Sequence, residues 1–235
     1  MATLDCFKLP FKSAGKLAIA FLLSLVPVLN FAVIGWQLKN AKAIMQNDFE
    51  PQDWKGFGKI LRDGFLAFVI LLVFALPAAI LFAAMFGSIA SIVLKGAQFT
   101  IANYSFYAEG LLAFIILTLA FIFVGPAGVL NFVAKGSFKK AFSPIEIAKI
   151  IFTKKYLKNW GISLVYVILL FWLYTAASQY VLPILPKEYW TISSYVFWLF
   201  FSFIFLIAGT TIWAMLGEAY TSSVAVSPVR EQANY

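Results

Sequence analysis

Residues 64–94 read GFLAFVILLVFALPAAILFAAMFGSIASIVL and contain no charged side chain. A helix needs about 20 apolar residues to cross a hydrocarbon layer of roughly 30 Å, so this stretch is long enough to span a membrane. Inside a bilayer the backbone polar groups must be paired within their own segment, which a helix achieves and a lone strand does not. The stretch therefore predicts a transmembrane helix.

The same pattern recurs along the rest of the 235 residues, because further uncharged windows cover 17–38, 110–134, 159–186 and 189–217. Apolar residues make up 63% of the chain and charged residues only 12%, about half the usual quarter. An aqueous protein could not hide so much apolar surface. We expect an all-α polytopic membrane protein with about four spanning helices, since no window shows the period-two alternation of a membrane barrel.

The first window is different, because Pro27 interrupts it and proline removes a backbone donor. Two interpretations are open for this N-terminal segment. Residues 14–26 and 31–44 form a re-entrant hairpin with its tip at 27–30, or 14–44 is one kinked spanning helix. We favour the hairpin, because it keeps the lysines at 8, 12 and 16 on the cytoplasmic side. A cleaved signal peptide is disfavoured, because no small-residue cleavage site follows the apolar run.

Lysine and arginine placement predicts the orientation. The connections 39–63 and 135–158 carry twelve of these residues, whereas the connections after the second and fourth windows carry one each, Lys95 and Lys187. Basic residues accumulate on the cytoplasmic side of a membrane. We expect a multi-pass protein of the cell membrane with both long connections and the C-terminus in the cytoplasm. Its single integral-membrane domain covers 1–222, and a polar tail covers 223–235.

The sequence VLNF occurs at 28–31 and again at 129–132, each time just after a proline, Pro27 or Pro126. We interpret this as a degenerate parallel repeat with halves of about 14–94 and 110–217. Each proline predicts a helix break that leaves a carbonyl group without its donor. We expect Asn30 and Asn131 to do equivalent structural work, facing protein and hydrogen-bonding beside these breaks. The alternative is that both asparagines line a solute path.

Both cytoplasmic connections are expected to contain an amphipathic helix that lies in the headgroup region, near anionic lipid. Over 51–65, with Pro51 as first helical residue, one helical face is apolar and another is basic. These interfacial residues are Trp54, Phe57, Leu61, Lys55, Lys59 and Arg62. In the second connection, Ser143 and Glu146 predict a capping box at the start of a helix over 144–157. This second helix has no clean polar face, so packing against protein as well as lipid is also expected for it. The alternative is that both segments are simple juxtamembrane connectors.

Small residues recur at every fourth position of the second window, namely Ala75, Ala79, Ala83, Gly87 and Ser91. Small side chains at that spacing let another helix approach closely. We expect this small-residue ridge to pack against a helix of the same chain rather than of another. Replacing Ala83 or Gly87 by leucine is then expected to destabilise the fold.

Residues that carry chemistry are sparse. The chain has no histidine and one cysteine, Cys6, so a zinc, haem or iron–sulfur centre is disfavoured. No ionisable side chain lies at a window centre, and Glu109 and Glu218 at the window ends are interpreted as interfacial. We assign no catalytic, cofactor-binding or metal-ligating residue and expect no enzyme. Nucleic-acid binding is not expected, because the membrane orientation already explains the formal charge of +8.

The stretch PAGVLNFVAKGSFKKAF at 126–142, followed by Glu146 and Ile147, resembles the central motif of a mostly archaeal integral-membrane family. That family is catalogued only as a domain of unknown function, number four-zero-one-three. The segments 9–11, 27–35, 53–54 and 217–220 agree in order and spacing, so the likeness covers about residues 5–222. The family usually has glutamine where Glu218 stands. The resemblance implies a polytopic helical protein and supplies no activity, cofactor or site residue.

From these observations we expect a non-enzymatic integral membrane protein that organises the bilayer or partner proteins, as a membrane-shaping protein, a scaffold or an accessory subunit. Its expected partners are the lipid bilayer, with anionic headgroups, and a second copy or a membrane-complex partner. The alternative is a small-solute transporter or channel with a midplane site near the helix breaks. A polar midplane cavity would favour the transporter, whereas a packed interior with an exposed apolar wedge would favour the organiser.

Overall fold

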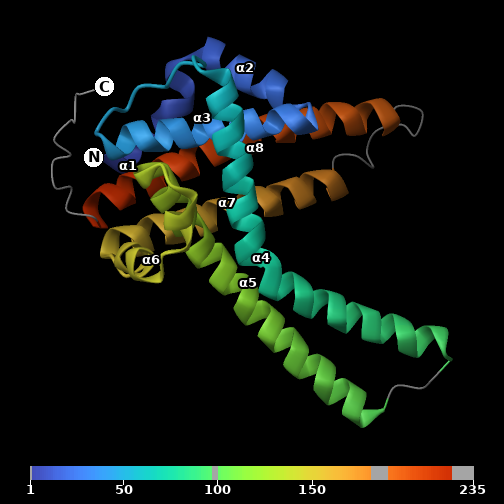
Figure 1. The fold of residues 1–235 in the computed structure, drawn as a ribbon. Helices are drawn as coiled ribbons and strands as arrows, with labels where there is room; N and C mark the ends of the chain where they lie inside the picture. The colour runs from blue at the N-terminus through green and yellow to red at the C-terminus, as the bar shows by residue number, and fades with distance from the viewer. Residues whose placement is uncertain (1, 97–99, 181–189, 224–235) are drawn as a thin grey trace.

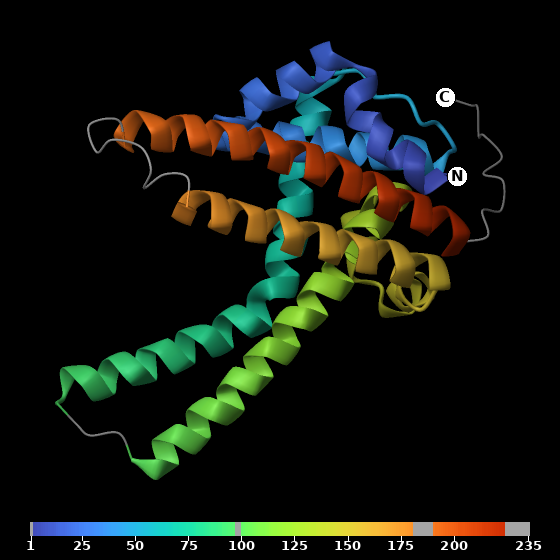
Figure 2. The ribbon, with the colours of Figure 1, turned by 180° about the vertical axis from the view of Figure 1, so that it is seen from behind.

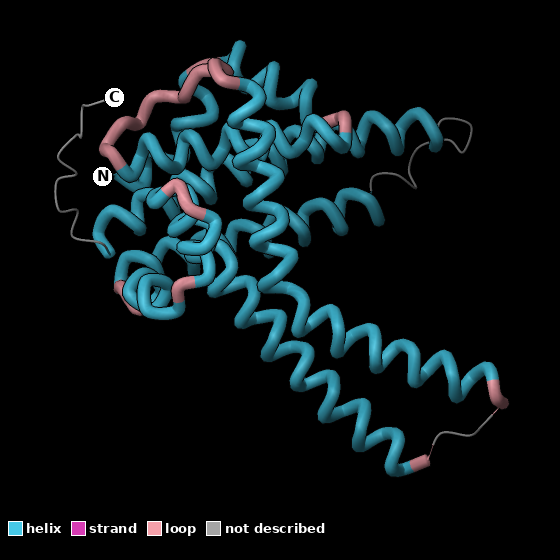
Figure 3. The backbone as a smooth tube through the Cα atoms, viewed as in Figure 1, coloured by secondary structure: helices cyan, strands magenta, loops and turns pink. Residues whose placement is uncertain are grey.

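The computed structural model describes residues 2–96, 100–180 and 190–223, and Figure 3 shows that all of these lie in helices, turns or loops. The elements in chain order are α1 Ala2–Lys8, the 3-10 helix η1 Leu9–Lys12, α2 Ala14–Ser24, α3 Pro27–Met45, α4 Phe57–Leu94, α5 Ile101–Lys135, the 3-10 helix η2 Phe138–Phe142, α6 Pro144–Ile151, α7 Lys154–Tyr180 and α8 Trp190–Ser223. The all-α fold class is confirmed. Beyond Ser223, the polar tail predicted at 223–235 lies outside the described residues.

Four helices are long and apolar enough to cross a membrane, covering Phe57–Leu94, Ser105–Lys135, Lys154–Tyr180 and Thr191–Thr221. They correspond to the last four of the five uncharged windows of the sequence. The chain is therefore a polytopic helical membrane protein, as its composition predicts. The N-terminal helices α2 and α3 are not among these four.

The first window forms two helices that fold back on each other. α2 ends at Ser24 and α3 begins at Pro27, while Val26 between them is extended, with φ −108° and ψ 118°. The residue before a proline avoids the helical conformation, and a proline at the first helical position needs no donor. Leu17 of α2 and Trp36 of α3 belong to the same buried cluster. The hairpin is the form adopted, with its tip before Pro27 rather than at 27–30.

Helix α3 is the centre of the molecule, because 11 of its 19 residues are buried. It packs against α4 and α8 with almost no space between the backbones. A Cβ atom on Gly35 would overlap the backbone carbonyl of Ile60, and one on Gly64 would overlap the backbone carbonyl of Phe31. Figure 1 shows α4 crossing α3 steeply at this point. Only glycine allows such a close approach.

Two pairs of helices leave this body separately. α4 and α5 form one long hairpin, and α7 and α8 lie side by side as the other (Figures 1 and 2). Both pairs point away from the side on which α1 begins, α8 ends and α6 lies. α4 bends near its middle, where Pro77 lies inside the helix and removes one backbone hydrogen bond. The two pairs therefore diverge.

The amphipathic helix predicted over 51–65 is not a separate element. Residues 51–56 form a loop, and 57–65 are the first turns of the long helix α4. Pro51 is buried in the loop and begins no helix. Extending α4 by more than two turns keeps its backbone donors and acceptors paired, which a loop before a spanning helix would not do. The basic residues Lys59 and Arg62 stay exposed, now on α4.

The second predicted amphipathic helix is shorter than expected, because α6 ends at Ile151 rather than at 157. Pro144 does begin the helix, as predicted, but Ser143 makes no side-chain cap. The capping box is therefore wrong, and the Glu146 carboxylate bonds Asn131 and Lys140 instead. α6 buries its isoleucines at 147, 150 and 151 within the protein, as the lack of a clean polar face predicts.

The small-residue ridge faces away from the neighbouring helix. Ala79, Ala83, Gly87 and Ser91 are exposed, and only Ala75 is half-buried. α5 contacts an adjacent face of α4 instead, where the Tyr107 hydroxyl donates to Ser88 Oγ at 3.0 Å. Successive helical residues are about 100° apart, so a shift of one residue in the contacting face is enough to expose the whole ridge. The expected partner helix within this chain is wrong.

Candidate functional site

Pro126 does not break its helix, since α5 continues through it to Lys135. The carbonyl four residues back, that of Ile122, accepts a hydrogen bond from Trp160 Nε1 at 3.1 Å. The next carbonyl, that of Phe123, accepts one from the Tyr156 hydroxyl at 2.7 Å. Both donors come from α7. The unpaired acceptor that the sequence predicts is therefore satisfied by aromatic side chains of another helix, and the predicted break is wrong.

Asn131 faces protein, as predicted, but it holds the second connection rather than a helix break. Its side chain is 1% exposed. Nδ2 donates to the Lys140 carbonyl at 2.6 Å and to Glu146 Oε2 at 2.8 Å, while the Tyr220 hydroxyl donates to Oδ1 at 3.3 Å. Lys140 and Asn131 hold the pKa of the Glu146 carboxyl below its ordinary value by donating hydrogen bonds to it. Four elements, α5, η2, α6 and α8, meet at this side chain.

Asn30 does not match Asn131. It is exposed near the start of α3, and its backbone amide donates to the Val26 carbonyl at 2.9 Å. Among the residues that the structure describes, its side chain has no hydrogen-bond partner. The α2–α3 break needs none, because the turn itself already satisfies the Leu23 carbonyl through the Val26 amide. The expected equivalence of the two asparagines is therefore wrong.

Glu218 is a buried ion-pair residue rather than an interfacial one. It is 5% exposed, and its Oε1 lies 3.1 Å from Lys155 Nζ. Asn159 Nδ2 donates to its other oxygen at 3.5 Å, and the Cys6 thiol lies 3.9 Å from that oxygen. The uncharged window ends at Gly217, but α8 continues to Ser223 and packs against α1 and α7. The end of the window was thus a poor guide to the end of the buried helix.

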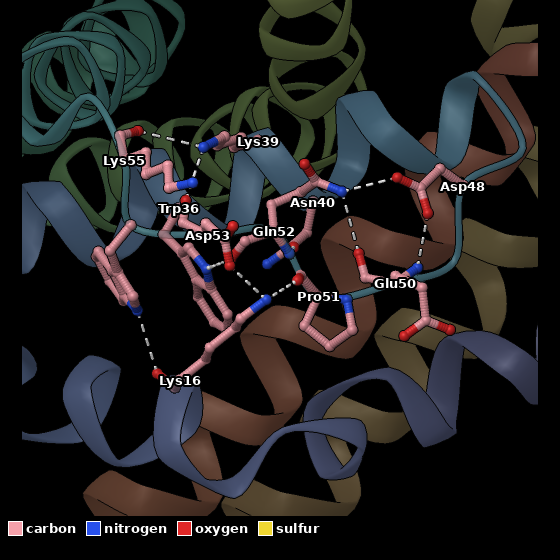
Figure 4. Close-up of polar contacts among 11 residues, drawn as sticks. Lys16, Trp36, Lys39, Asn40, Asp48, Glu50, Pro51, Gln52, Asp53 and Lys55 are labelled. Carbon is pink, nitrogen blue, oxygen red and sulfur yellow. Dashed lines mark hydrogen bonds and ion pairs between the residues drawn. The ribbon is translucent and has the colours of Figure 1, made fainter.

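The loop 46–56 is fixed to η1 and α2 by its acidic residues and its carbonyl groups, and Figure 4 shows the contacts of Lys16 on α2. Lys12 Nζ donates to the Phe49 carbonyl at 2.7 Å and to Glu50 at 2.8 Å. Lys16 Nζ donates to the Pro51 carbonyl and pairs with Asp53 at 2.8 Å. This bond and the positive charge of Lys16 lower the pKa of Asp53. The Glu50 carboxylate is thereby held by η1 and the Asp53 carboxylate by α2.

The same loop is fixed to α3 by two tryptophans. Trp54 stacks on Trp36, with ring centroids 5.2 Å apart and planes 10° apart. Trp36 Nε1 donates to the Gln52 carbonyl at 2.8 Å, and the Gln52 amide donates to Asn40 Oδ1 at 2.7 Å. Trp54, predicted to lie in the headgroup region, is half-buried in protein. The loop is therefore held along most of its length.

A cavity of about 590 Å³ opens between this loop, α3, α4 and the end of α5. Five basic side chains line it against one carboxylate, that of Asp63. The basic residues are Lys39, Lys42, Lys55, Lys59 and Arg62. We call this the cationic cavity. Three of the five were predicted as interfacial, whereas Lys39 and Lys42 were counted only as topology signals, because the sequence does not reveal that α3 lies beside α4.

Lys39 lines the cavity and is held by the loop. Its Nζ donates to two backbone carbonyls, that of Asp53 at 2.6 Å and that of Lys55 at 3.3 Å. Burial lowers the pKa of Lys39, and the charges of Lys16, Lys59 and Lys55 lower it further, against the opposing effect of Asp53. An anion in the cavity would relieve this repulsion.

The inner wall of the cationic cavity is apolar. Its residues come from α3, α4 and α5 with η2, and they are Leu38, Ile60, Leu66, Phe132, Val133 and Phe138. Leu66 and Phe132 lie on helices that are long enough to cross the membrane. Basic side chains at the mouth and apolar side chains at the wall suit an amphiphilic anion. Among the described residues no cluster of His, Cys, Asp and Glu could hold a metal ion.

Comparison with known proteins places this chain in a family. A family model described as "Protein of unknown function (DUF4013)" matches residues 19–178, more than half of the 235 residues. The matched stretch includes the whole cationic cavity. No curated protein and no solved structure matches the chain. The chain belongs to the DUF4013 family.

Proposed function

We propose that this protein is a non-enzymatic organiser of the bilayer, which gathers anionic lipid at its basic end and separates lipid between two apolar helix pairs. One observation carries the proposal. The α4–α5 and α7–α8 pairs leave one packed body in different directions (Figures 1 and 2). Lipid must fill the space between them, since apolar helix surfaces in a bilayer are covered by acyl chains or by protein.

The body supports this proposal because it is packed. Trp36, Leu38 and Ile44 of α3 are each 1% exposed, and the backbones of α3 and α4 touch at two glycines. A rigid junction of this kind fixes the angle between helices that leave it, because packed interiors resist deformation. The angle between the pairs is therefore a property of the protein rather than of the surrounding lipid.

The helix pairs support it because they are apolar and exposed. Only 17% of the most apolar window of α4 is buried, against 44% for α8. Large side chains cover the outer halves of α4 and α5, among them Phe82, Phe86, Leu111 and Ile116. Exposed apolar surface on this scale belongs in hydrocarbon.

The transporter alternative has less support. The cationic cavity lies where α4 begins and α5 ends rather than midway along the spanning helices. A second hollow, of about 460 Å³, is lined by Val167, Ile168, Phe171, Trp172 and Thr175 on α7 alone, and it is almost wholly apolar. A solute site is expected between elements and with convergent polar groups.

The proposed organiser has a defined orientation in the cell membrane and a surface for a protein partner. We place the basic end, with the C-terminus and both lysine-rich connections, on the cytoplasmic side of the cell membrane. The outward-facing small-residue ridge on α4 leaves room for a second copy or a membrane-complex partner. We also propose that the chain is of archaeal type, as the resemblance implies, and that its two halves form a degenerate parallel repeat.

Reconstitution of the full chain into vesicles of neutral and anionic lipid tests this function. We expect vesicles to become smaller or deformed as the protein content rises, by electron cryo-microscopy, with no efflux of a trapped uncharged solute above that of empty vesicles. Pro77→Ala, which straightens α4, should weaken the deformation without changing solute efflux. Solute efflux from undeformed vesicles would instead establish the transporter.

A further inference from the structure

We infer that the cationic cavity binds the phosphomonoester headgroup of one anionic lipid, with an acyl chain lying on the apolar wall formed by α4 and α5. The inference rests on the proposed function in one respect, that the basic end meets anionic lipid. It adds a defined site and a preferred headgroup chemistry.

Four lysines of the cationic cavity have no carboxylate partner in the part of the chain that the structure describes. Among the described residues, no carboxylate forms an ion pair with Lys39, Lys42, Lys55 or Lys59. Of the acidic residues of the loop, Glu50 and Asp53 pair with lysines of the N-terminal segment, and Asp48 accepts hydrogen bonds from Glu50 and Gln52 within the loop. Four cations are thus gathered around one space without an ion-pair partner of their own, and the single carboxylate that lines it, that of Asp63, pairs with Arg62, so a bound anion would add the charge that balances them.

The cationic cavity offers hydrogen-bond donors for phosphate oxygens. An ammonium group offers three donors and suits phosphate oxygens. α4 begins beside the cavity after Gly56, which lines it, adopts φ 77° and leaves the helix without a side-chain cap. The first amides of a helix have no intrahelical partner, and the helix dipole adds positive potential there. Arg62 is engaged by Asp63 at 3.2 Å and Lys39 by two backbone carbonyls, so Lys42, Lys55, Lys59 and the helix end remain as donors.

The size and the apolar wall of the cationic cavity favour a lipid over a soluble phosphate. A volume of about 590 Å³ greatly exceeds what a lone phosphate needs and lies in the range of sites for larger ligands. The apolar wall includes Leu66 and Phe132 on membrane-spanning helices. Anchored there, a headgroup would have its acyl chain already beside hydrocarbon. A soluble ion would leave this wall uncovered.

The excess of basic residues favours a phosphomonoester headgroup over a phosphodiester. A phosphomonoester carries a charge of about −1.5 to −2 near neutral pH and three terminal oxygens. A phosphodiester carries a single charge on two such oxygens. Five basic residues against one carboxylate favour the ligand with more charge and more acceptors. Binding should also raise the pKa of Lys39, since the anion offsets its cationic neighbours.

The test is displacement of a fluorescent phosphatidic acid from the detergent-solubilised full chain. The competitors are unlabelled phosphatidic acid, phosphatidylglycerol and inorganic phosphate. The double variant Lys42→Gln with Lys59→Gln removes two exposed cavity lysines. Its matched control, Lys149→Gln with Lys154→Gln, removes the same charge from α6 and the start of α7, outside the cavity. Thermal melting shows that each variant is folded, and Lys55→Gln on the loop serves as a further cavity variant.

We expect phosphatidic acid to bind about ten-fold or more weakly to the cavity double variant, since charged hydrogen bonds contribute about 1.5 kcal/mol or more each. The control should change affinity by less than about two-fold, because distant surface charges are screened. Equal losses in both doubles would overturn the site in favour of diffuse surface charge. Displacement by phosphatidylglycerol or by inorganic phosphate at the same concentration as phosphatidic acid would overturn the headgroup or the lipid assignment. The vesicle-deformation assay without phosphatidic acid is independent of this site, so a failed site with intact deformation is distinguishable from a failed organiser function.

Discussion

The lysine-rich connections 39–63 and 135–158 resemble each other in composition but use their acidic neighbours differently. In the second, Glu146 pairs with Lys140 and also accepts a bond from Asn131, while Lys155 pairs with the buried Glu218. In the first, Glu50 and Asp53 of the loop are held by lysines that precede it, at 12 and 16. Two lysines of the second connection thus pair with carboxylates packed beside them, whereas among the described residues the four lysines of the first have no carboxylate partner and line a cavity.

The difference shows that the number of lysines does not decide what a basic connection does. The N-terminal hairpin supplies counter-charges for the loop 46–56 and so leaves a cationic cavity on the other side of α3. No such hairpin stands beside the second connection, where α6 packs directly on α5, α7 and α8. The elements packed beside each basic connection therefore decide whether its lysines line a cavity or pair with carboxylates.

The largest effect is expected from filling the glycine contact that supports the first connection. In Gly35→Ala the new Cβ would overlap the Ile60 carbonyl, so α3 and α4 must separate. Overpacking of this kind costs about 3 kcal/mol when backbone atoms are the obstacle. The melting temperature in detergent should fall sharply. Gly58→Ala is the matched control, because its Cβ meets nothing within 4 Å. Similar melting of both variants would contradict the backbone contact.

A smaller loss is expected from removing the polar anchor of the second connection. Asn131→Leu deletes three hydrogen bonds, including one to the half-buried Glu146 carboxylate. The loss of such bonds, one of them to a charged group, costs about 2 kcal/mol. Asn30→Leu should be nearly neutral, since that side chain is exposed. Chemical or thermal unfolding of both variants measures the difference, and equal losses would restore the equivalence predicted from the repeat.

Acid should weaken the second connection through Glu146. Its pKa in the folded protein lies below the ordinary value of 4.5, so the ionised form stabilises the fold above that pH. This contribution is lost as the pH falls through the lowered pKa. We expect the parent chain to melt above Glu146→Gln near neutral pH, with the gap closing in acid. A gap that stays constant with pH would show that the charge of Glu146 does not matter.

The smallest effect is expected outside both connections, at the small-residue ridge. Ala83→Leu and Gly87→Leu should change stability in detergent by less than about 0.5 kcal/mol, because both positions are exposed on α4. This reverses the expectation from the sequence. Gly110→Leu is the contrasting variant, because its Cβ would lie 2.9 Å from Met85 Sδ. A large loss for Ala83→Leu in a detergent-solubilised oligomer would place a second copy on the ridge.

The sequence predicts the spanning helices well because uncharged length is a local property. It also predicts two N-terminal helices, since a proline restricts its own backbone and that of Val26 before it. It fails where a distant element decides the outcome. Trp160 satisfies the Ile122 carbonyl from α7, so Pro126 breaks nothing. Trp54 stacks on Trp36 of α3. This contact holds residues 51–56 as a loop against α3 instead of a surface helix.

The cationic cavity was only partly predictable for the same reason. Lys55, Lys59 and Arg62 follow from the basic face of one segment. Lys39 joins them only because α3 crosses α4 at two glycines, a contact that leaves no periodic pattern in the sequence. Glu218 was misplaced because its window ends one residue earlier, although its helix continues.

The comparison of the two connections depends on their facing the same side of the membrane, and cysteine labelling measures this most directly. Cys6 is buried, which raises the pKa of its thiol to about 12, and Cys6→Ala removes it from the background. Single substitutions Gln46→Cys, Lys139→Cys and Lys95→Cys report on the two connections and on the α4–α5 tip. Gln46 is preferred to Asn47, whose φ of 64° strains other residues. We predict that an impermeant reagent labels 46 and 139 from one side and 95 from the other. Labelling of 95 from the same side as 139 would contradict the membrane orientation proposed here.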